Sequence, residues 1–131
     1  MIINKTKCRV IYGDTDKMGI AYHANYLRWF EIGRTELFRF FSLPYKEIEA
    51  KGILLPVSEV YCKFLFPAQY DDILIIETSF DKSFKGGMKF IYTIISENSR
   101  KTVTQGYTKH ACLDLKGRVI RPPKFLTDIM D

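Results

Sequence analysis

The hydrophobic positions divide the chain into a short strand-like start, a helical stretch and a long strand-rich remainder. Residues 7–12 alternate between polar and apolar side chains, which predicts a first strand ending at Gly13. Residues 24–41 instead repeat every three or four positions, which is the period of an amphipathic helix. Leu43-Pro44 ends this helix, and residues 45–51 predict a short second one. The apolar stripe of the long helix comprises Tyr26, Phe30, Gly33, Leu37, Phe40 and Phe41.

Gly33 lies inside this apolar stripe. A glycine in the middle of a helix costs about 1 kcal/mol relative to alanine. We therefore expect a neighbouring element to approach the helix closely at this position.

The chain beyond Gly52 predicts strands. Residues 57–66 alternate, and residues 73–80 form a nearly continuous apolar run typical of a central strand. Gly86-Gly87 indicates a hairpin turn before two further strands, over residues 88–95 and 102–115. Residues 121–123, Arg-Pro-Pro, are expected to end the regular structure.

The order strand, helix, four strands predicts an α+β fold in which a five-stranded antiparallel sheet wraps around one long helix. Residues 1–131 would form a single domain. One helix covers only one sheet face, so we expect another subunit to cover the opposite face or an edge strand. The chain is thus expected to be a homo-oligomer, a dimer or a tetramer. The apolar residues that suggest this cover are Ile73, Ile75, Ile91 and Ile95.

Composition excludes several protein classes. Apolar residues make up 47% of the 131 positions and charged residues 27%, the balance of a packed globular chain. No apolar run is long enough for a membrane span, and the N-terminus lacks the pattern of a signal peptide. Three scattered cysteines do not make a disulfide framework or a zinc cluster. We expect a reduced, cytoplasmic protein.

The net charge of +5 is unevenly distributed. Residues 82–131 contain ten basic and four acidic side chains, whereas residues 1–81 contain ten and eleven. A basic C-terminal part is compatible with nucleic acid, an acidic carrier protein or a phosphorylated small molecule, and equally with solubility alone.

The segment before the long helix holds the candidate chemistry. Asp14 and Asp16 precede Gly19 and His23 in a glycine-containing connection. An aspartate before a helix is ordinarily a cap or turn former. Here, however, glycine permits close approach of a ligand, and the first helical amides could polarise a carbonyl while a carboxylate acts as nucleophile or base. These are the groups needed to transfer an acyl group to water.

The same segment, Asp-Thr-Asp-x-x-Gly-x-x-Tyr-His-Ala-Asn-Tyr-Leu at residues 14–27, resembles the hotdog-fold acyl-CoA thioesterases. The resemblance is to the branch containing 4-hydroxybenzoyl-CoA thioesterase and the YbgC-type enzymes. It extends over nearly the whole chain, to about Pro122, and includes residues 34–36, 66–68 and 70–72. It implies a hotdog fold and hydrolysis of an acyl-CoA to a carboxylic acid and CoA, without a cofactor or metal.

The resemblance also implies roles for individual residues. Asp16 would be the catalytic carboxylate, and the backbone amide of His23 would bind the thioester oxygen while its side chain positions substrate or water. Asp14 would hold the loop. Met18 stands where this branch has a small residue, which implies an effect on pocket width or acyl selectivity. The remaining substrate-site candidates in this segment are Gly19, Tyr22, Asn25 and Tyr26.

Other candidate residues lie further along the chain. Glu59 stands on the polar face of an aromatic-rich strand, where a salt bridge is the commoner role of such a side chain. Lys82, Lys85 and Lys89 flank the predicted hairpin and could pair with the phosphates of CoA. Two alternative functions remain open: hydrolysis of acyl carrier protein thioesters, and a non-catalytic nucleic-acid-binding module. Our expectation is a CoA ester substrate and no nucleic-acid partner.

Overall fold

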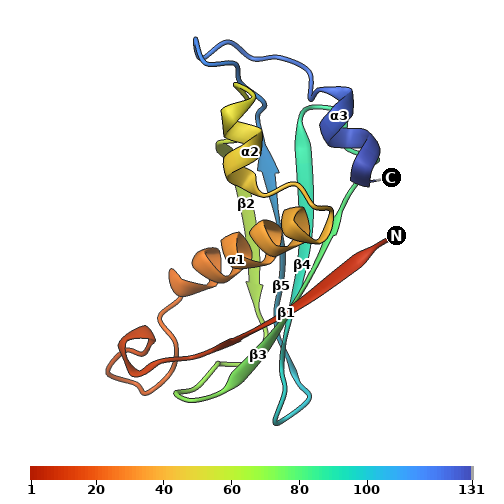
Figure 1. The fold of residues 1–131 in the computed structure, drawn as a ribbon. Coiled ribbons are helices and arrows are strands. Elements are labelled where there is room, and N and C mark those ends of the chain that lie inside the picture. Colours follow the sequence, from red (N-terminus) through yellow and green to blue (C-terminus); the bar gives the residue numbers. More distant parts are fainter. Residues whose placement is uncertain (131) are drawn as a thin grey trace.

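The computed structural model describes residues 1–130, which form a five-stranded sheet and one long helix together with short helical segments (Figure 1). The strands are β1 (Ile3–Arg9), β2 (Val57–Phe64), β3 (Ile73–Phe80), β4 (Met88–Ser96) and β5 (Thr102–His110). The α-helices are α1 (Asn25–Phe40), α2 (Tyr45–Ala50) and α3 (Lys124–Thr127), and two 3-10 helices span Tyr12–Asp14 and Asp128–Met130. The expected α+β fold is confirmed.

The sheet is antiparallel throughout, in the order β1-β3-β4-β5-β2. Strands β1 and β2 are therefore its two edges. Helix α1 crosses one sheet face and contacts β1, β3 and β4 (Figure 1). On β3 and β4 buried side chains alternate with half-buried ones, because one face meets the helix and the other does not.

The contact between α1 and the sheet is close at Gly33, as the sequence predicts. A Cβ atom built on Gly33 would lie 2.3 Å from Thr78 Oγ1 and 2.7 Å from Ile76 Cγ2. Near it, the rings of Phe30 and Tyr92 stack with centroids 4.2 Å apart. Glycine is thus required by packing, and this offsets its poor helix propensity.

The buried stripe of α1 differs at its end from the predicted one. Phe40 is 59% exposed, whereas Trp29 and Phe38 are buried. Phe38 is drawn inward because its ring packs against Tyr45 and Phe90, with centroids 6.0 and 5.5 Å apart. The prediction that Phe40 belongs to the core is wrong for this reason.

Several predicted strand boundaries also shift. The first strand begins earlier, at Ile3, and ends at Arg9, because residues 12–14 form a 3-10 turn. The last strand ends at His110 rather than at residue 115, since Leu113 instead forms isolated bridges with Leu54 and Val119.

Regular structure does not end at residues 121–123. The short helix α3 follows, and Leu126 and Met130 on this C-terminal segment are buried. The sequence contains too few residues here for a helical period to be evident.

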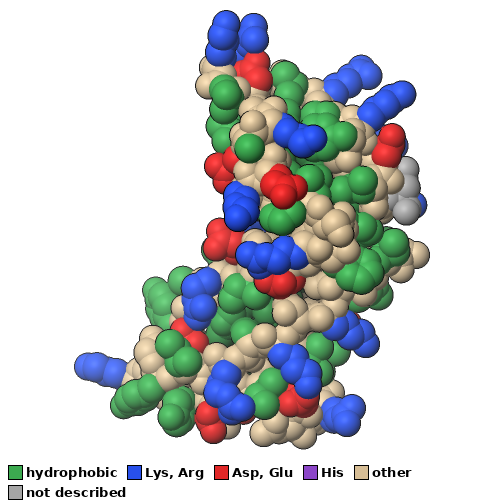
Figure 2. All heavy atoms as spheres, viewed as in Figure 1, with side chains coloured by type: hydrophobic (Ala, Val, Ile, Leu, Met, Phe, Trp, Pro, Cys, Tyr) green, Lys and Arg blue, Asp and Glu red, His purple; other side chains and the backbone are tan. Residues whose placement is uncertain are grey.

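The outer sheet face and the β2 edge remain partly accessible. Ile73, Ile75, Ile91 and Ile95 are half-buried, and on β2 both Val60 and Tyr61 are more than 40% exposed. Figure 2 shows basic and acidic side chains interspersed over the face of the molecule that carries α1. Among residues 1–130, no helix is long and apolar enough to cross a membrane.

Candidate functional site

The loop before α1 is anchored by Asp14. Its side chain is buried, and one carboxylate oxygen lies 2.6 Å from the guanidinium of Arg28 while the other accepts a hydrogen bond from the Ile11 amide at 2.9 Å. The Asp14 carbonyl accepts hydrogen bonds from the Tyr22 amide and the Asn25 side chain, both at 2.8 Å. Asp14 thus ties both ends of the loop to the start of α1, the structural role expected of it.

Asp16 sits in a tight turn within this loop. Its amide donates to the Ile20 carbonyl at 2.9 Å, and its carbonyl accepts from the Gly19 amide at 3.0 Å. Gly19 has a φ of +79°, a left-handed conformation that favours glycine. The Asp16 Oδ1 atom accepts a hydrogen bond from the Met18 amide at 2.8 Å. Its other carboxylate oxygen accepts no hydrogen bond from residues 1–130, so it is available to a ligand.

The N-terminus of α1 presents unpaired backbone donors beside this turn. Within residues 1–130, the amides of His23 and Ala24 donate no hydrogen bond, and the helix has no side-chain cap. Such amides carry the positive end of the helix dipole and bind anionic oxygen. The side chain of His23 is exposed, and its ring lies 4.3 Å from that of Tyr22.

A cavity of about 350 Å³ opens between the loop, the start of α1 and the segment that follows β2. Tyr26 supports its floor, because its hydroxyl accepts a hydrogen bond from the Ala68 amide at 3.3 Å and its ring meets Phe64 edge-on at 4.9 Å. Burial raises the pKa of the Tyr26 phenol. The lining residues are Asp16, Met18, Ile20, Ala21, His23, Tyr26, Phe64, Leu65, Phe66 and Pro67. A carboxylate, the His23 residue directly before α1 and an apolar wall therefore meet in one cavity, which suits an acyl compound with a polar reactive carbon.

The structure brings most of the candidate residues in the loop together. Asp16, Met18, His23 and Tyr26 all line the cavity. The remaining three candidates have different positions: Gly19 shapes the turn, Tyr22 packs on His23, and Asn25 bonds the Asp14 carbonyl.

Glu59 does not line the cavity that Asp16 lines. It lies on β2, where its carboxylate accepts a hydrogen bond from the Tyr107 hydroxyl at 2.7 Å and pairs with the Lys109 ammonium at 3.1 Å. These two hydrogen bonds lower the pKa of the Glu59 carboxyl. Glu59 thus makes the salt bridge that the sequence favours for it.

The three lysines lie at the opposite end of β3 from the Asp16 loop. The loop bonds to residues that precede β3, whereas Lys82, Lys85 and Lys89 follow its last residue, roughly 25 Å away along an eight-residue strand. Lys89 pairs with Asp81 at 3.7 Å and lies 4.5 Å from the Tyr107 ring centroid. Within one protomer, therefore, these lysines do not meet Asp16.

The sequence alone missed two contributions to the site. The wall formed by residues 64–67 comes from a distant segment, for which the only signal was the family-like Phe-Pro-Ala at residues 66–68. The second contribution is Arg28, which lies on α1 and pairs with Asp14. Within residues 1–130, no group of three or more potential metal ligands is clustered.

Comparisons with known proteins agree with this geometry. Residues 10–131 match the family described as the thioesterase-like superfamily. The chain is 33% identical to YneP of Bacillus subtilis over 115 residues, which are 87% of this chain and 82% of the relative. It is 32% identical to the acyl-CoA thioesterase YbgC of Haemophilus influenzae over 108 residues, covering 82% and 78% of the two chains.

A solved structure gives the same result for the fold. The DHNA-CoA thioesterase of Staphylococcus aureus superposes with a TM-score of 0.89 at 28% identity, covering 98% of this chain and 86% of that one. These similarities confirm the resemblance found in residues 14–27 and the hotdog fold that it implies.

Proposed function

Because the chain belongs to the thioesterase-like superfamily, we propose that it is an acyl-CoA thioesterase that uses Asp16 as its catalytic carboxylate. The reaction adds water across the thioester bond: the acyl carbon gains the water oxygen, the carbon–sulfur bond breaks, and the sulfur leaves with a proton as CoA. The names of relatives such as YbgC support the substrate class. The observation that carries the proposal is that Asp16, with one carboxylate oxygen that accepts no hydrogen bond from residues 1–130, shares a cavity with His23, whose amide donates none within the same residues.

Each group at the site has a chemical task in this reaction. The thioester carbonyl oxygen would accept a hydrogen bond from the His23 amide, and the dipole of α1 would stabilise the negative charge that develops on this oxygen. Asp16 would attack the carbonyl carbon or take a proton from the attacking water. The exposed His23 imidazole would position the substrate or water. The apolar wall formed by residues 64–67 would pack against the acyl chain.

We further propose that the functional unit contains at least two protomers joined along β2. This edge strand exposes both faces, with Val57, Val60, Tyr61 and Phe64 each more than 40% exposed. Such an edge is costly unless another strand pairs with it. A two-fold axis through its centre pairs the two copies antiparallel, so that Val57 of one lies near Phe64 of the other.

This pairing would also give the lysines a role. Lys89 and Val57 both lie next to the end of β5, because Met88 and Val57 each pair with His110. An antiparallel partner would therefore bring its own hairpin toward the Asp16 end of the first protomer. The side chains of Lys82, Lys85 and Lys89 would then lie within reach of the phosphates of CoA.

The test is hydrolysis of short, long, branched and aromatic acyl-CoAs by the wild type and by Asp16→Asn, with thiol release monitored. The variant removes the charge but not the shape, so we expect a loss of at least about 1,000-fold in kcat with unchanged oligomeric state. Lys17→Gln, one residue away and exposed, is the matched control and should retain activity. Full activity of Asp16→Asn would refute the role of Asp16. Repeating the panel with acyl carrier protein thioesters shows whether the enzyme prefers acyl groups bound to CoA or to acyl carrier protein.

A further inference from the structure

A second cavity lies further along α1, away from Asp16. It has a volume of about 240 Å³ and opens between α1, the start of α2, the segment before β2 and the ends of β4 and β5. Most of its wall is apolar or aromatic, but Arg34 and Glu31 also face it. Its walls also include Thr35, Phe38, Tyr45, Phe90, His110 and the segment 55–57.

A buried chain of hydrogen bonds forms the back of this cavity. His110 Nδ1 lies 2.9 Å from the Leu55 carbonyl oxygen, which can only accept, so Nδ1 carries the proton. Burial lowers the pKa of His110 to about 4, so the ring is neutral and Nε2 is an acceptor. The Thr108 hydroxyl, 2.8 Å away, therefore donates to Nε2, and the Tyr92 hydroxyl donates to Thr108 at 2.6 Å.

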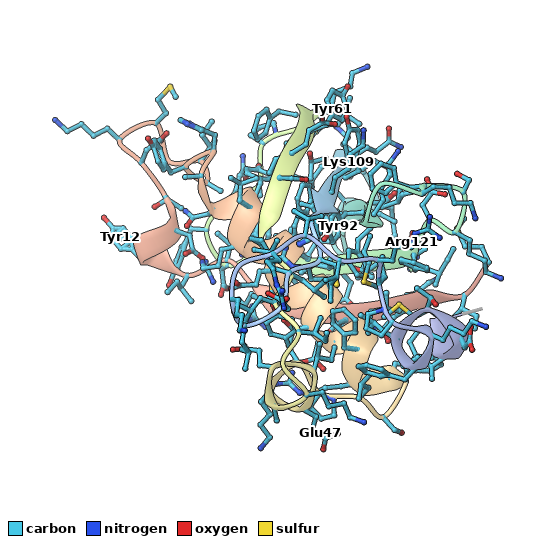
Figure 3. All side chains as sticks on the ribbon, turned by 90° about the horizontal axis from the view of Figure 1, so that it is seen from above. Tyr12, Glu47, Tyr61, Tyr92, Lys109 and Arg121 are labelled. Carbon is cyan, nitrogen blue, oxygen red and sulfur yellow. The ribbon has the colours of Figure 1, made fainter. Side chains whose placement is uncertain are left out.

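This chain of hydrogen bonds determines which group of Tyr92 faces Arg34. With its proton given to Thr108, the Tyr92 oxygen is left as an acceptor, and the nearby Arg34 guanidinium opposes the increase that burial causes in the pKa of this phenol. Figure 3 shows Tyr92 near the middle of the molecule, far from the surface position of Tyr12. One side of the Arg34 guanidinium thus donates a hydrogen bond to the buried Tyr92 hydroxyl.

Among residues 1–130, the rest of the guanidinium has no close anionic partner. The Arg34 side chain is only 17% exposed, and among residues 1–130 its paired carboxylate is Glu31, whose Oε1 atom is 3.9 Å away and 67% exposed as a side chain. That distance is longer than the donor–acceptor distance of a hydrogen bond. A guanidinium has five N–H donors, and a largely buried cation is costly unless its donors are satisfied. The geometry favours an anionic ligand in the cavity.

Two further groups define which anion would fit. Tyr45 Oη accepts a hydrogen bond from the Leu55 amide at 3.2 Å, so the proton of the Tyr45 hydroxyl remains available for a hydrogen bond to a ligand. The Thr35 residue also lines the cavity. A planar carboxylate can take two parallel N–H bonds from one guanidinium. The apolar rings of Phe38 and Phe90 would contact the methylene groups attached to it.

We propose that this cavity is a carboxylate subsite in which Arg34 binds the distal carboxylate of an acyl chain. This inference rests on the proposed thioesterase function and on antiparallel pairing of β2. That pairing places the Leu55–Val57 wall of one protomer beside the wall of residues 64–67 in the other, so the two cavities become neighbours. The thioester then lies at Asp16 of one protomer while the far end of the acyl group reaches Arg34 of the other. The substrate class is an ω-carboxyacyl-CoA.

The test compares ω-carboxyacyl-CoAs of four to ten carbons with neutral acyl-CoAs of equal length, using wild type and Arg34→Gln. A charge-assisted hydrogen bond contributes about 1.5–3 kcal/mol, so the wild type should prefer the carboxylated ester by about 10- to 100-fold in kcat/KM at the best length. Arg34→Gln should lose that preference, because its KM should rise much more for the carboxylated esters than for the neutral ones. Equal losses on both substrate classes, or no preference in the wild type at any length, would overturn the proposal.

Two further variants separate recognition from folding. Arg34→Lys keeps the charge but not the paired donors, so it should show an intermediate preference, and it decides the test if Arg34→Gln does not fold. Glu31→Gln removes the competing carboxylate and should increase the preference; a decrease would contradict the proposal.

A binding measurement makes the subsite testable apart from catalysis. Free adipate should shift the NMR signal of the Arg34 side chain in wild type, and Arg34→Gln should abolish the binding measured by calorimetry. If adipate binds but no thioester is hydrolysed, the thioesterase assignment fails and the carboxylate subsite stands. If thioesters are hydrolysed without any carboxylate preference or adipate binding, only the subsite fails.

Discussion

The Arg28 guanidinium lies 2.6 Å from the carboxylate of Asp14, and this pair ties the loop before α1 to the first turn of the helix. The Asp14 side chain is 7% exposed and that of Arg28 is 47% exposed. The pair is thus buried at the carboxylate and open to water at the guanidinium. Its disruption should affect the loop that carries Asp16 before it affects the core.

We expect Arg28→Gln to lower the free energy of unfolding by about 1–2 kcal/mol, less than a fully buried pair because Arg28 is half exposed. Loosening the loop should also lower kcat for a thioester substrate, since Asp16 and the helix amides would lose their fixed relation. Urea denaturation and steady-state kinetics measure the two effects. The control is Arg39→Gln, which breaks the exposed pair with Glu36 and should change stability by less than about 0.5 kcal/mol. Equal effects of both variants would show that the loop anchor is unimportant.

Gly33→Ala should destabilise the fold although alanine is the better helix former. The added methyl would lie 2.3 Å from Thr78 Oγ1 and 2.7 Å from Ile76 Cγ2, and such overpacking costs about 1–3 kcal/mol, more than the gain in propensity of about 1 kcal/mol. The Thr78 hydroxyl is buried without a partner among the described residues. Thr78→Ala should therefore restore much of the loss in the double variant. Thermal melts of the four proteins measure this coupling, and simple additivity would contradict it.

Stability should depend on pH through His110. Burial lowers its pKa to about 4 from an ordinary value of 6.5, so the unfolded chain binds the proton more readily than the folded one between these two values. Its contribution to stability is complete above pH 6.5 and is lost as the pH falls toward 4, by up to about 3 kcal/mol.

The measurement is urea denaturation of wild type and His110→Gln at pH 7 and pH 4.5. The variant should be less stable at pH 7 and show a smaller decrease on acidification. The control is Gln105→Asn, at an exposed position of β5 without a titratable group, which should leave the pH dependence unchanged. The same slope in wild type and His110→Gln would exclude His110 as its source.

Charge on the β2 edge should separate the protomers. Val60 is 41% exposed in the middle of this strand, and a lysine there would be buried unpaired if two β2 strands meet. We expect Val60→Lys to lower the mass measured by light scattering to that of one protomer and to abolish thioesterase activity. Ile3→Lys, on the opposite edge strand β1 and 53% exposed, should do neither. If the mass of Val60→Lys is unchanged, the interface between protomers does not lie on β2.

Much of the fold follows from local pattern. The helical period of residues 24–41, the apolar run at 73–80 and the turn at Gly86-Gly87 predict elements that the structure contains, because period and turn chemistry act over a few neighbouring residues. Even Gly33 could be assigned to a close contact. The motif at residues 14–27 similarly located the candidate site, since its members are near one another along the chain.

Tertiary structure decided what depends on distant segments. The inward position of Phe38 depends on Phe90, the wall beside Asp16 comes from residues 64–67, and Arg34 shares a cavity with His110 only because α1 packs on the sheet. The members of these pairs are 48 to 76 positions apart, and no local period relates them. The sequence by itself determined the elements and the reactive loop, because both arise from short-range preferences. Only packing across the sheet determined which side chains share a cavity and which cation lacks a close anion.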